Sequence, residues 1–324
     1  MAEPAPAEVV GSPPQARAKH SLANLLRVAF VVAVLAFGIW YVAARWHRIE
    51  TALSELSWWS VAASLLAGGA GMFLSMLGWR SILADLGVRM PIRSAAWVFF
   101  VGQLGKYLPG SVWSFLAQAE LAKGQEASRK ASLVGSVLGA GVSVASGTAI
   151  AIVLLPFGSK DALERYWWVV LIVPFLVLAL HPRVVTVVVN RALRLIRKQP
   201  LEQAPSYRGL LRSTGWYSLG WLLLGLHAWL LVIGLGGTGA RALPIAIGGF
   251  TLAFCLGILF IPAPAGAGIR DVALVVALSP VLGESSALAL ALLSRVAFVL
   301  LDFAMAAGAW LWAGRWTRRG RSVV

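Results

Sequence analysis

The sequence predicts an all-α polytopic membrane protein with about six transmembrane helices and two re-entrant helical hairpins arranged as an inverted repeat. Of its 324 residues, 59% are hydrophobic and only 13% are charged, and the mean hydropathy is +0.79. A soluble core of this length cannot bury so much apolar surface. Two breaks rich in Gly and Pro, at residues 105–113 and 262–271, interrupt apolar segments at corresponding places in the two halves. Paired interruptions of this kind are typical of membrane proteins that enclose a cavity at mid-depth.

One membrane domain is expected between two short tails. Residues 1–20 are rich in Pro and Ala and poor in large apolar side chains, so we expect a disordered cytoplasmic tail. Residues 21–316 form a single transmembrane domain, with pseudo-halves at about 21–157 and 165–316. Residues 317–324 form a basic cytoplasmic tail.

Six apolar runs are predicted to cross the bilayer, which takes about 20 residues. The first, residues 22–44, exceeds the roughly 7 to 15 residues of a signal-peptide core, so we expect a retained span. The run 167–181 is short and contains Pro174, so it is expected to kink or to lie beside thinned bilayer. The predicted spans are residues 22–44, 58–79, 131–156, 167–181, 216–236 and 287–313.

The segments around the two breaks do not cross the bilayer as readily as the six runs. Residues 94–105 would make about 18 Å of helix at ~1.5 Å per residue, which reaches only the middle of a bilayer. Pro109 and Gly110 then break the chain, and residues 111–122 return to the same basic side. The second segment is likewise expected to enter and leave the membrane on one side, and Pro280 is expected to end its last helix. Both segments are therefore predicted to be re-entrant hairpins. The helices of the second are residues 244–262 and 269–278.

The distribution of basic residues predicts the orientation. With the N-terminus inside, the cytoplasmic loops and tails hold most of the Lys and Arg, and this positive-inside pattern requires both breaks to be hairpins. The net charge of +15 comes from these loops and not from a soluble basic module, so no nucleic-acid partner is expected. We predict a multi-pass protein of the bacterial cytoplasmic (inner) membrane with both termini cytoplasmic. The predicted outer loops hold only Arg45, Arg48, Lys160, Arg165 and Arg241.

Charged residues lie at predicted membrane depth in or beside both breaks. They are Lys106, Arg270, Asp271, Arg295 and Asp302. Three positive charges against two negative ones leave one positive charge without a counter-charge. Each charge costs at least about 2.5 to 3.5 kcal/mol at a helix centre, so we expect these residues to face a cavity or one another. Arg295 and Asp302 are two helical turns apart on one face, and an ion pair between them, direct or through an intermediary, is the structural alternative to a binding role.

The same region is predicted to bind an anion. Helices that begin at Ser111 and Ile269 would direct free N–H groups and positive dipole ends to mid-depth, beside Lys106 and Arg270. The phosphate of a lipid head group would satisfy this site. The candidate substrate-binding residues are Lys106, Pro109, Gly110, Ser111, Gly266, Gly268, Arg270, Asp271, Arg295 and Asp302. The alternative is that the breaks are packing turns of an eight-helix bundle, since small residues also serve close helix packing.

Other chemistry has little support in the sequence. Cys255 is the single cysteine and the four histidines have no ligand spacing, so no metal site, cofactor or catalytic residue is predicted. His227 is the one histidine well inside a span, and an interhelical hydrogen bond is favoured over a proton relay. A GxxxxGK[ST] nucleotide-binding loop is absent, so a gradient, the membrane potential or mass action would have to drive any transport.

Three short motifs resemble the flippase-type membrane region of lysylphosphatidylglycerol synthases and their stand-alone relatives. They are GKYLPG at 105–110, the basic return at 123–131 and PAPAGAGIRD at 262–271. The family pattern is PxPxGxGxRE, and this chain has an aspartate where the glutamate is usual. The matching residues are Pro262, Pro264, Gly266, Gly268, Arg270 and Asp271. The resemblance covers about residues 22–316 and implies a bilayer-embedded lipid translocase of two inverted halves, without the synthase domain.

We therefore predict a lipid translocase that moves an anionic or phosphate-bearing lipid, or a lipid-linked intermediate, across the cytoplasmic membrane. The alternative is a membrane-embedded enzyme or accessory protein of cell-envelope lipid or glycolipid biosynthesis, although no DxD motif or His pair supports an enzyme. The expected partners are a membrane lipid substrate and anionic inner-leaflet lipids, on which the basic amphipathic stretch 184–198 is expected to lie. A homodimer and a biosynthetic-pathway partner stay open.

Overall fold

The structure is a computed structural model. It describes residues 47, 50, 56–108, 112–123, 129–158, 164, 167–195, 197, 199–201, 203–260 and 263–317. The contacts divide the chain into the units Met1–Arg45 and Trp46–Val324, and all described residues belong to the second. The predicted N-terminal tail, the first span at 22–44 and the end of the C-terminal tail lie outside the described residues. So do four residues of the breaks, Pro109, Gly110, Ser111 and Pro262.

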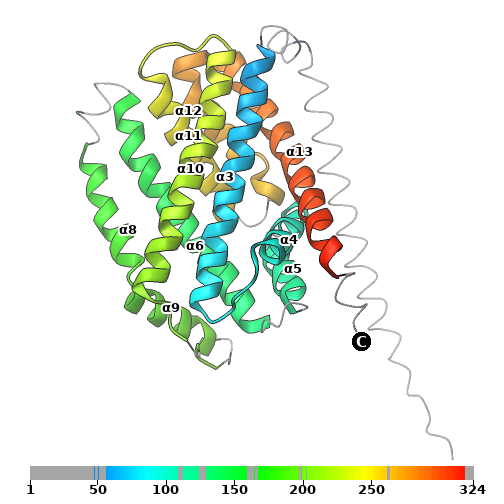
Figure 1. Cartoon of the computed structure of the whole chain (residues 1–324). Helices are drawn as coiled ribbons and strands as arrows, with labels where there is room; N and C mark the ends of the chain where they lie inside the picture. Colours follow the sequence, from blue (N-terminus) through cyan, green and yellow to red (C-terminus); the bar gives the residue numbers. More distant parts are fainter. Residues whose placement is uncertain are drawn as a thin grey trace, which may run out of the picture. The chain divides into compact units, whose positions relative to one another are not determined.

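The described part of the chain is helical and contains no strand (Figure 1). Its elements are α3 (Trp58–Asp85), α4 (Ile92–Gln103), η1 (Leu104–Tyr107), α5 (Val112–Lys123), α6 (Arg129–Leu154), η2 (Leu155–Gly158), η3 (Trp167–Ile172), α8 (Val173–Ala179), α9 (Pro182–Leu195), α10 (Tyr207–Gly234), α11 (Ala242–Leu259), η4 (Pro264–Gly266), α12 (Ile269–Leu282) and α13 (Glu284–Thr317).

Six helices of the described part are long and apolar enough to cross a membrane. They are Trp58–Asp85, Lys130–Gly158, Tyr207–Gly234, Ala242–Leu259, Pro264–Leu282 and Glu284–Ala313. The predicted all-helical membrane fold with about six spans is therefore confirmed. α3, α6, α10 and α13 cover all or most of four of the spans predicted from the sequence. α11 and α12, predicted as a re-entrant pair, also meet the length and hydropathy criteria, so their re-entrant placement stays a prediction.

The structure agrees with the kink expected in the run 167–181 but not with the helix end expected at Pro280. Within that run, η3 changes to α8 next to Pro174, and the chain then bends by 69° into α9. A proline disfavours helical geometry in the residue before it, which explains the bend before Pro182. Pro280 does not end α12, which continues to Leu282 and stops at Gly283, whose φ is +76°. A missing amide donor so near the helix end costs little, whereas the left-handed glycine ends the helix.

Helices α3 and α10 lie side by side along most of their length (Figure 1). Small residues permit this close approach, since a Cβ atom on Gly71 would lie 2.9 Å from the carbonyl oxygen of Gly220. The Ser213 hydroxyl donates a hydrogen bond to the carbonyl of Gly78, 2.9 Å away across the same interface. α3 and α10 therefore form a closely packed helix pair on which the other described helices assemble.

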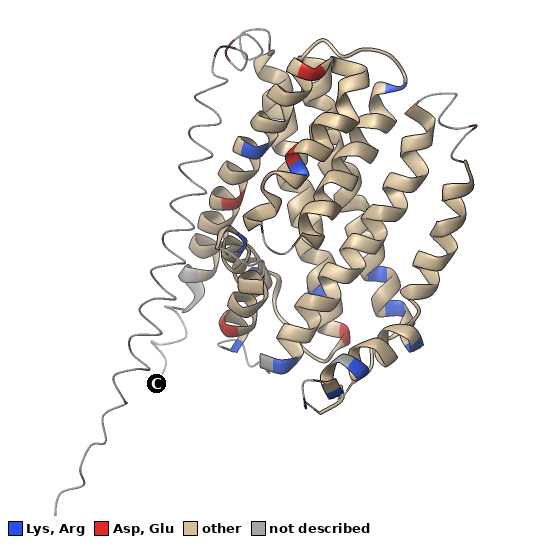
Figure 2. Ribbon diagram, turned by 180° about the vertical axis from the view of Figure 1, so that it is seen from behind, with Lys and Arg blue, Asp and Glu red and all other residues tan. Residues whose placement is uncertain are grey.

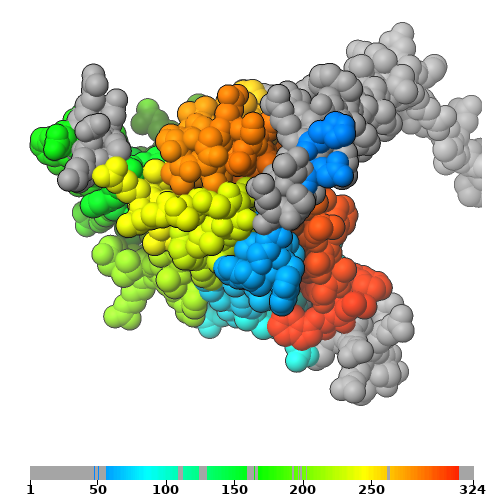
Figure 3. Space-filling view, turned by 90° about the horizontal axis from the view of Figure 1, so that it is seen from above, coloured from blue at the N-terminus to red at the C-terminus, as the bar shows by residue number. Residues whose placement is uncertain are grey.

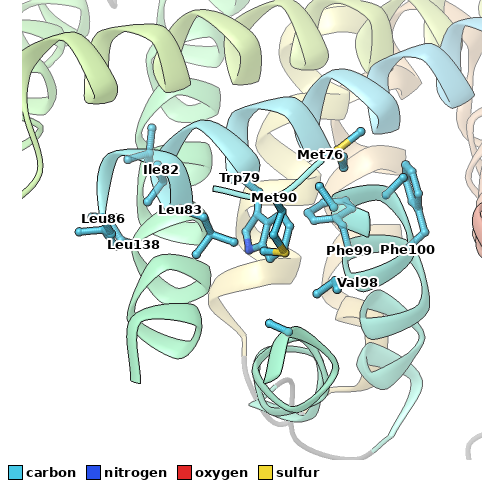
Figure 4. Close-up of a cluster of buried hydrophobic side chains, with 14 of the residues drawn as sticks. Met76, Trp79, Ile82, Leu83, Leu86, Met90, Val98, Phe99, Phe100 and Leu138 are labelled. Atoms are coloured by element: carbon cyan, nitrogen blue, oxygen red, sulfur yellow. The ribbon is translucent and has the colours of Figure 1, made fainter. Parts of the chain in front are cut away.

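Two apolar clusters flank that pair. The first joins α3 to α4 and contains Met76, Trp79 and Phe99, which Figure 4 shows packed together. The Trp79 indole also donates a hydrogen bond of 2.9 Å to the Ser136 hydroxyl, which attaches α6 to this cluster. The second cluster is built from α10 to α13 around Phe250. Each predicted half of the domain thus contributes most of one core.

The two breaks approach each other inside the bundle. α4 and α5 have 12 residues each and pack against one another as a hairpin, in which a Cβ on Gly105 would lie 2.8 Å from the backbone nitrogen of Ser114. α11 and α12 form the second hairpin. It lies nearer the top of the bundle in Figure 1, whereas α5 of the first hairpin lies nearer the bottom. Figure 3 shows the bundle from this top end, where residues of α12 and of α13 are both visible. η1 contacts η4, so the breaks meet, as an inverted repeat requires. The repeat itself stays a prediction.

Candidate functional site

A cluster of charged side chains lies where the two breaks meet α13. η1 supplies Lys106, the start of α12 supplies Arg270 and Asp271, and α13 supplies Arg295 and Asp302. Most other Lys and Arg residues gather at the end of the bundle that holds α5 and α9, as Figure 2 shows. The structure therefore brings together the five charged residues that the sequence placed at membrane depth.

Asp302 holds the first break against α13. Its carboxylate oxygen Oδ2 lies 2.6 Å from Lys106 Nζ and accepts a hydrogen bond of 2.6 Å from the hydroxyl of Tyr107. Asp302 is 2% exposed and Lys106 is 28% exposed, so the pair is largely removed from solvent. The Tyr107 ring also stacks on Phe303, the next residue of α13. The other carboxylate oxygen, Oδ1, is buried and has no hydrogen-bond partner among the described residues.

Asp271 holds the second break against α13. Its carboxylate receives two hydrogen bonds from Arg295, from Nε at 3.2 Å and from Nη2 at 2.7 Å. The same carboxylate accepts the backbone N–H of Gly268 at 3.1 Å, which closes the first turn of α12. Gly268 has a φ of +84°, which favours glycine. Arg295 and Asp302, considered from the sequence as an ion pair, direct or through an intermediary, instead bind separate partners: Arg295 binds Asp271, and Asp302 binds Lys106 and Tyr107.

Arg270 is the remaining positive charge. It is 7% exposed, and the described residues offer it no ion-pair partner. Its guanidinium lies 3.7 Å from the ring centroid of Phe254 and 5.3 Å from that of Phe298, close enough for cation–π attraction. A hydrogen bond of 3.4 Å reaches the hydroxyl of Ser294, and Nε is buried and has no hydrogen-bond partner among the residues that the structure describes. The excess positive charge counted in the sequence is therefore Arg270.

A tight backbone crossing explains how Arg270 reaches the interior. Gly266 has a φ of +67°, and a Cβ atom there would lie 2.7 Å from the Cα atom of Gly257 on α11. A Cβ atom on Gly257 would in turn lie 3.3 Å from that of Arg270. Ala265 is left-handed as well, at a φ of +50°. The glycines of the PAPAGAG motif thus let η4 press against α11 and turn the first residues of α12 inward.

A buried histidine continues the polar path from Arg270. His227 Nε2 lies 3.1 Å from the Ser294 hydroxyl, and Nδ1 lies 2.8 Å from the hydroxyl of Ser64 on α3. This interhelical hydrogen bonding confirms the prediction made for His227. Its ring also packs edge-on against Phe298. Ser64, His227, Ser294 and Arg270 therefore form one chain of contacts through α3, α10, α13 and α12.

Several residues of the site were not predicted. They are Tyr107, His227 as a neighbour of Arg270, Phe250, Phe254, Ser294 and Phe298. The spacing of Ser294, Phe298 and Asp302 at i, i+4 and i+8 could have indicated one face of α13, since such residues share a helix face. Pro109, Gly110 and Ser111 lie outside the described residues, so their predicted part in the site stays a prediction.

The described residues contain no group of three His, Cys, Asp or Glu side chains that could hold a metal ion. The cluster instead offers cationic and hydrogen-bond donors to an anion: Lys106, the buried guanidinium of Arg270 and the first turn of α12. Helix N-termini beside such cations favour negative charge. Chemically, this arrangement is suited to binding a phosphate or carboxylate.

The fold and the cluster define a multi-pass membrane protein with charged residues held at two helix breaks. The model of the family described as "Lysylphosphatidylglycerol synthase TM region" matches residues 24–315, and the chain belongs to that family. The resemblance carried by the two Gly/Pro motifs is thereby confirmed. No curated protein matches the chain. Family membership indicates a membrane protein of lipid or cell-envelope biosynthesis or translocation.

Proposed function

We propose that the protein moves an anionic or phosphate-bearing lipid, or a lipid-linked intermediate, between the leaflets of the cytoplasmic membrane. The single observation that carries this proposal is the buried guanidinium of Arg270, which has no carboxylate partner among the described residues. A lipid phosphate would supply the missing negative charge. Family membership supports the lipid as the kind of molecule involved.

The cost of burial argues against a purely structural arginine. A charged side chain in a membrane interior costs at least about 2.5 to 3.5 kcal/mol, and buried charges are otherwise paired. Asp271 and Asp302 are nearby but each already binds another cation. Contact with Phe254 and Phe298 offsets part of the cost but leaves Arg270 Nε without a hydrogen-bond partner in the described part of the chain. A guanidinium kept in this state can bind a phosphate through two parallel hydrogen bonds.

Lys106 is the group we propose to exchange partners during transport. It is the more exposed member of its pair, so an incoming phosphate can compete with Asp302 for its ammonium group. Asp302 would keep the hydroxyl of Tyr107 as a donor while Lys106 turns to the ligand. Separation of this pair would release η1 from α13. We propose that this release opens the site toward one leaflet, and that the Asp271–Arg295 pair has the same role for the other.

Reconstitution tests the proposal. The purified protein is placed in vesicles that contain fluorescent phosphatidylglycerol, and an impermeant quencher measures how fast the probe changes leaflet. We expect faster exchange than in empty vesicles and no change in the mass of the extracted lipid. A new lipid product would support an enzyme instead. Absence of both flux and product with this probe and with a phosphate-bearing polyprenyl lipid would overturn the proposal and favour an accessory role.

A further inference from the structure

A cavity lies away from the charged cluster, between α6, α8 and α10. Its volume is about 340 Å³, which falls within the range of ~300–1,000 Å³ common for ligand sites. The lining is almost entirely apolar, with Ile150 from α6, Leu176 and Leu180 from α8 and Leu222 from α10. Ser218 of α10 contributes one of the few hydroxyl groups. None of the charged residues at the breaks lines this cavity.

The cavity opens sideways from the bundle. Three residues that line it are exposed: Val153 on α6, Val177 on α8 at 64% and Leu222 on α10. Because α6 and α10 are candidate membrane spans, we expect exposed apolar side chains on them to face the hydrocarbon of the bilayer. An occupant can therefore enter directly from the membrane, and an apolar chain is the chemistry that the lining fits.

A basic helix lies at one end of the cavity. The lining residue Leu180 follows α8 directly, and α9 begins two residues later at Pro182. One face of α9 is buried against the bundle through Val185 and Leu193. The opposite face is exposed and mixes three arginines with apolar side chains. Its exposed residues include Arg183, Val184, Val187, Val188, Arg191, Arg194 and Leu195.

This mixture of arginine and valine on one exposed face is typical of a helix that lies in a membrane interface. Arginines there attract anionic lipid head groups, and their aliphatic stems rest on apolar surface. Figure 2 shows blue residues gathered at the end of the bundle that contains α9. A lipid whose head group lies beside Arg183 would have its acyl chain next to Leu180, which lines the cavity near α9.

We propose that the cavity between α6, α8 and α10 holds one acyl chain of an anionic phospholipid whose head group lies beside α9, with Arg183 as a head-group contact. The lipid is a resident ligand on the lateral surface of the bundle and not the transported molecule. The site therefore goes beyond the proposed function. It binds independently of Arg270, so either proposal can fail without the other.

Photolabelling tests the site. The probe is phosphatidylglycerol with a diazirine on its acyl chain, in phosphatidylcholine vesicles that contain the full chain, and mass spectrometry locates the adducts. We expect adducts on α6, α8 and α10 in the unchanged protein. Ala149→Phe fills the cavity and should remove them, because Ala149 lines it. Ala307→Phe makes the same change at an exposed position of α13 and should leave them unaltered.

A second variant tests the head group. Arg183→Gln should reduce labelling by phosphatidylglycerol about fivefold, the effect of one basic residue near an anionic surface, and leave labelling by a phosphatidylcholine probe unchanged. Equal labelling of the cavity by the two probes in the unchanged protein would overturn the proposal. Adducts that persist in a folded Ala149→Phe protein would also overturn it. Photo-leucine placed at position 176 that cross-links two copies of the chain, with no lipid adducts in the cavity, would assign the cavity to a dimer.

Discussion

Lys106 Nζ lies 2.6 Å from Asp302 Oδ2, and this pair joins the first break to α13 with the cation on the break. The pair at the second break has the opposite arrangement, because Asp271 supplies the anion there and Arg295 of α13 supplies the cation. α13 is thus attached to both breaks through ion pairs of reversed polarity. Arg270 is left between them without a counter-charge among the described residues.

The first prediction concerns the stability of the Lys106–Asp302 pair. Asp302→Asn should destabilise the protein, because removal of one member leaves the charge of the other without compensation. The loss should be smaller than the ~3–5 kcal/mol typical of a fully buried pair, since Lys106 is partly exposed. The double variant Lys106→Gln with Asp302→Asn should recover part of the loss. Unfolding in detergent measures the coupling, expected at about 0.5–3 kcal/mol. Purely additive effects of the two changes would contradict the pairing.

The second prediction distinguishes two glycines of the second break. Gly266→Ala should be the more damaging change, because its Cβ atom would collide with the backbone of Gly257 at 2.7 Å in addition to the strain of a positive φ. Gly268→Ala should cost only the backbone strain, about 1–3 kcal/mol, since no atom lies within 4 Å of the added Cβ. Thermal unfolding of both variants gives the order. An equal or reversed order would show that η4 is packed differently.

The third prediction concerns the placement of the first hairpin. If α4 and α5 are re-entrant, cysteines at Arg89 and Lys123, which flank the hairpin and are exposed, should both react only from the cytoplasmic side. An impermeant maleimide applied to spheroplasts of a Cys255→Ala background makes the measurement. Labelling of either position from outside the cell, in a folded protein, would make the hairpin a full span.

The same measurement tests the second hairpin. Cysteines at Arg241 and Glu284 flank α11 and α12 and are exposed, and both should react from outside. Figure 2 is consistent with this assignment, because Lys and Arg gather at the opposite end of the bundle. Reaction of the two positions on different sides would remove the inverted symmetry of the breaks.

Much of the fold could be predicted because membrane spans depend on composition and length. The apolar runs that form α3, α6, α10 and α13 are each long enough to cross a bilayer, and so many consecutive apolar residues are typical of a membrane span. The bend after α8 was harder to predict, because Pro174 and Pro182 act on local geometry that hydropathy does not report. The continuation of α12 past Pro280 depends on how near the helix end lies, which Gly283 determines.

The sequence predicted which charged residues form the site, but it did not predict which of them pair with one another. Charges at membrane depth must find partners or a cavity, so their count already indicated one excess cation. Which cation it is depends on the rotation of α13, and sequence spacing alone does not give that rotation. Phe254 and Phe298 were missed for a related reason, since aromatic residues are ordinary in apolar helices. Their contact with Arg270 arises only when α11, α12 and α13 pack together.

The charge of Arg270 is proposed to serve a ligand and not the fold. Arg270→Met removes the charge and keeps an apolar side chain of similar length beside Phe254 and Phe298. Because replacing a buried charge by an apolar group is often neutral or stabilising, the variant should unfold at the same temperature as the unchanged protein or above it. Arg270→Lys should keep part of the flux, since a point charge cannot reproduce the guanidinium fork.

The flux of fluorescent phosphatidylglycerol through reconstituted Arg270→Met protein is therefore the most direct measurement, with Arg241→Met as the matched change of an exposed arginine. We expect flux to fall about 30-fold or more in Arg270→Met, which corresponds to the loss of a charged hydrogen bond of ~2 kcal/mol, and to stay unchanged in Arg241→Met. Unaltered flux in a folded Arg270→Met protein would contradict the account and leave Arg270 a structural residue.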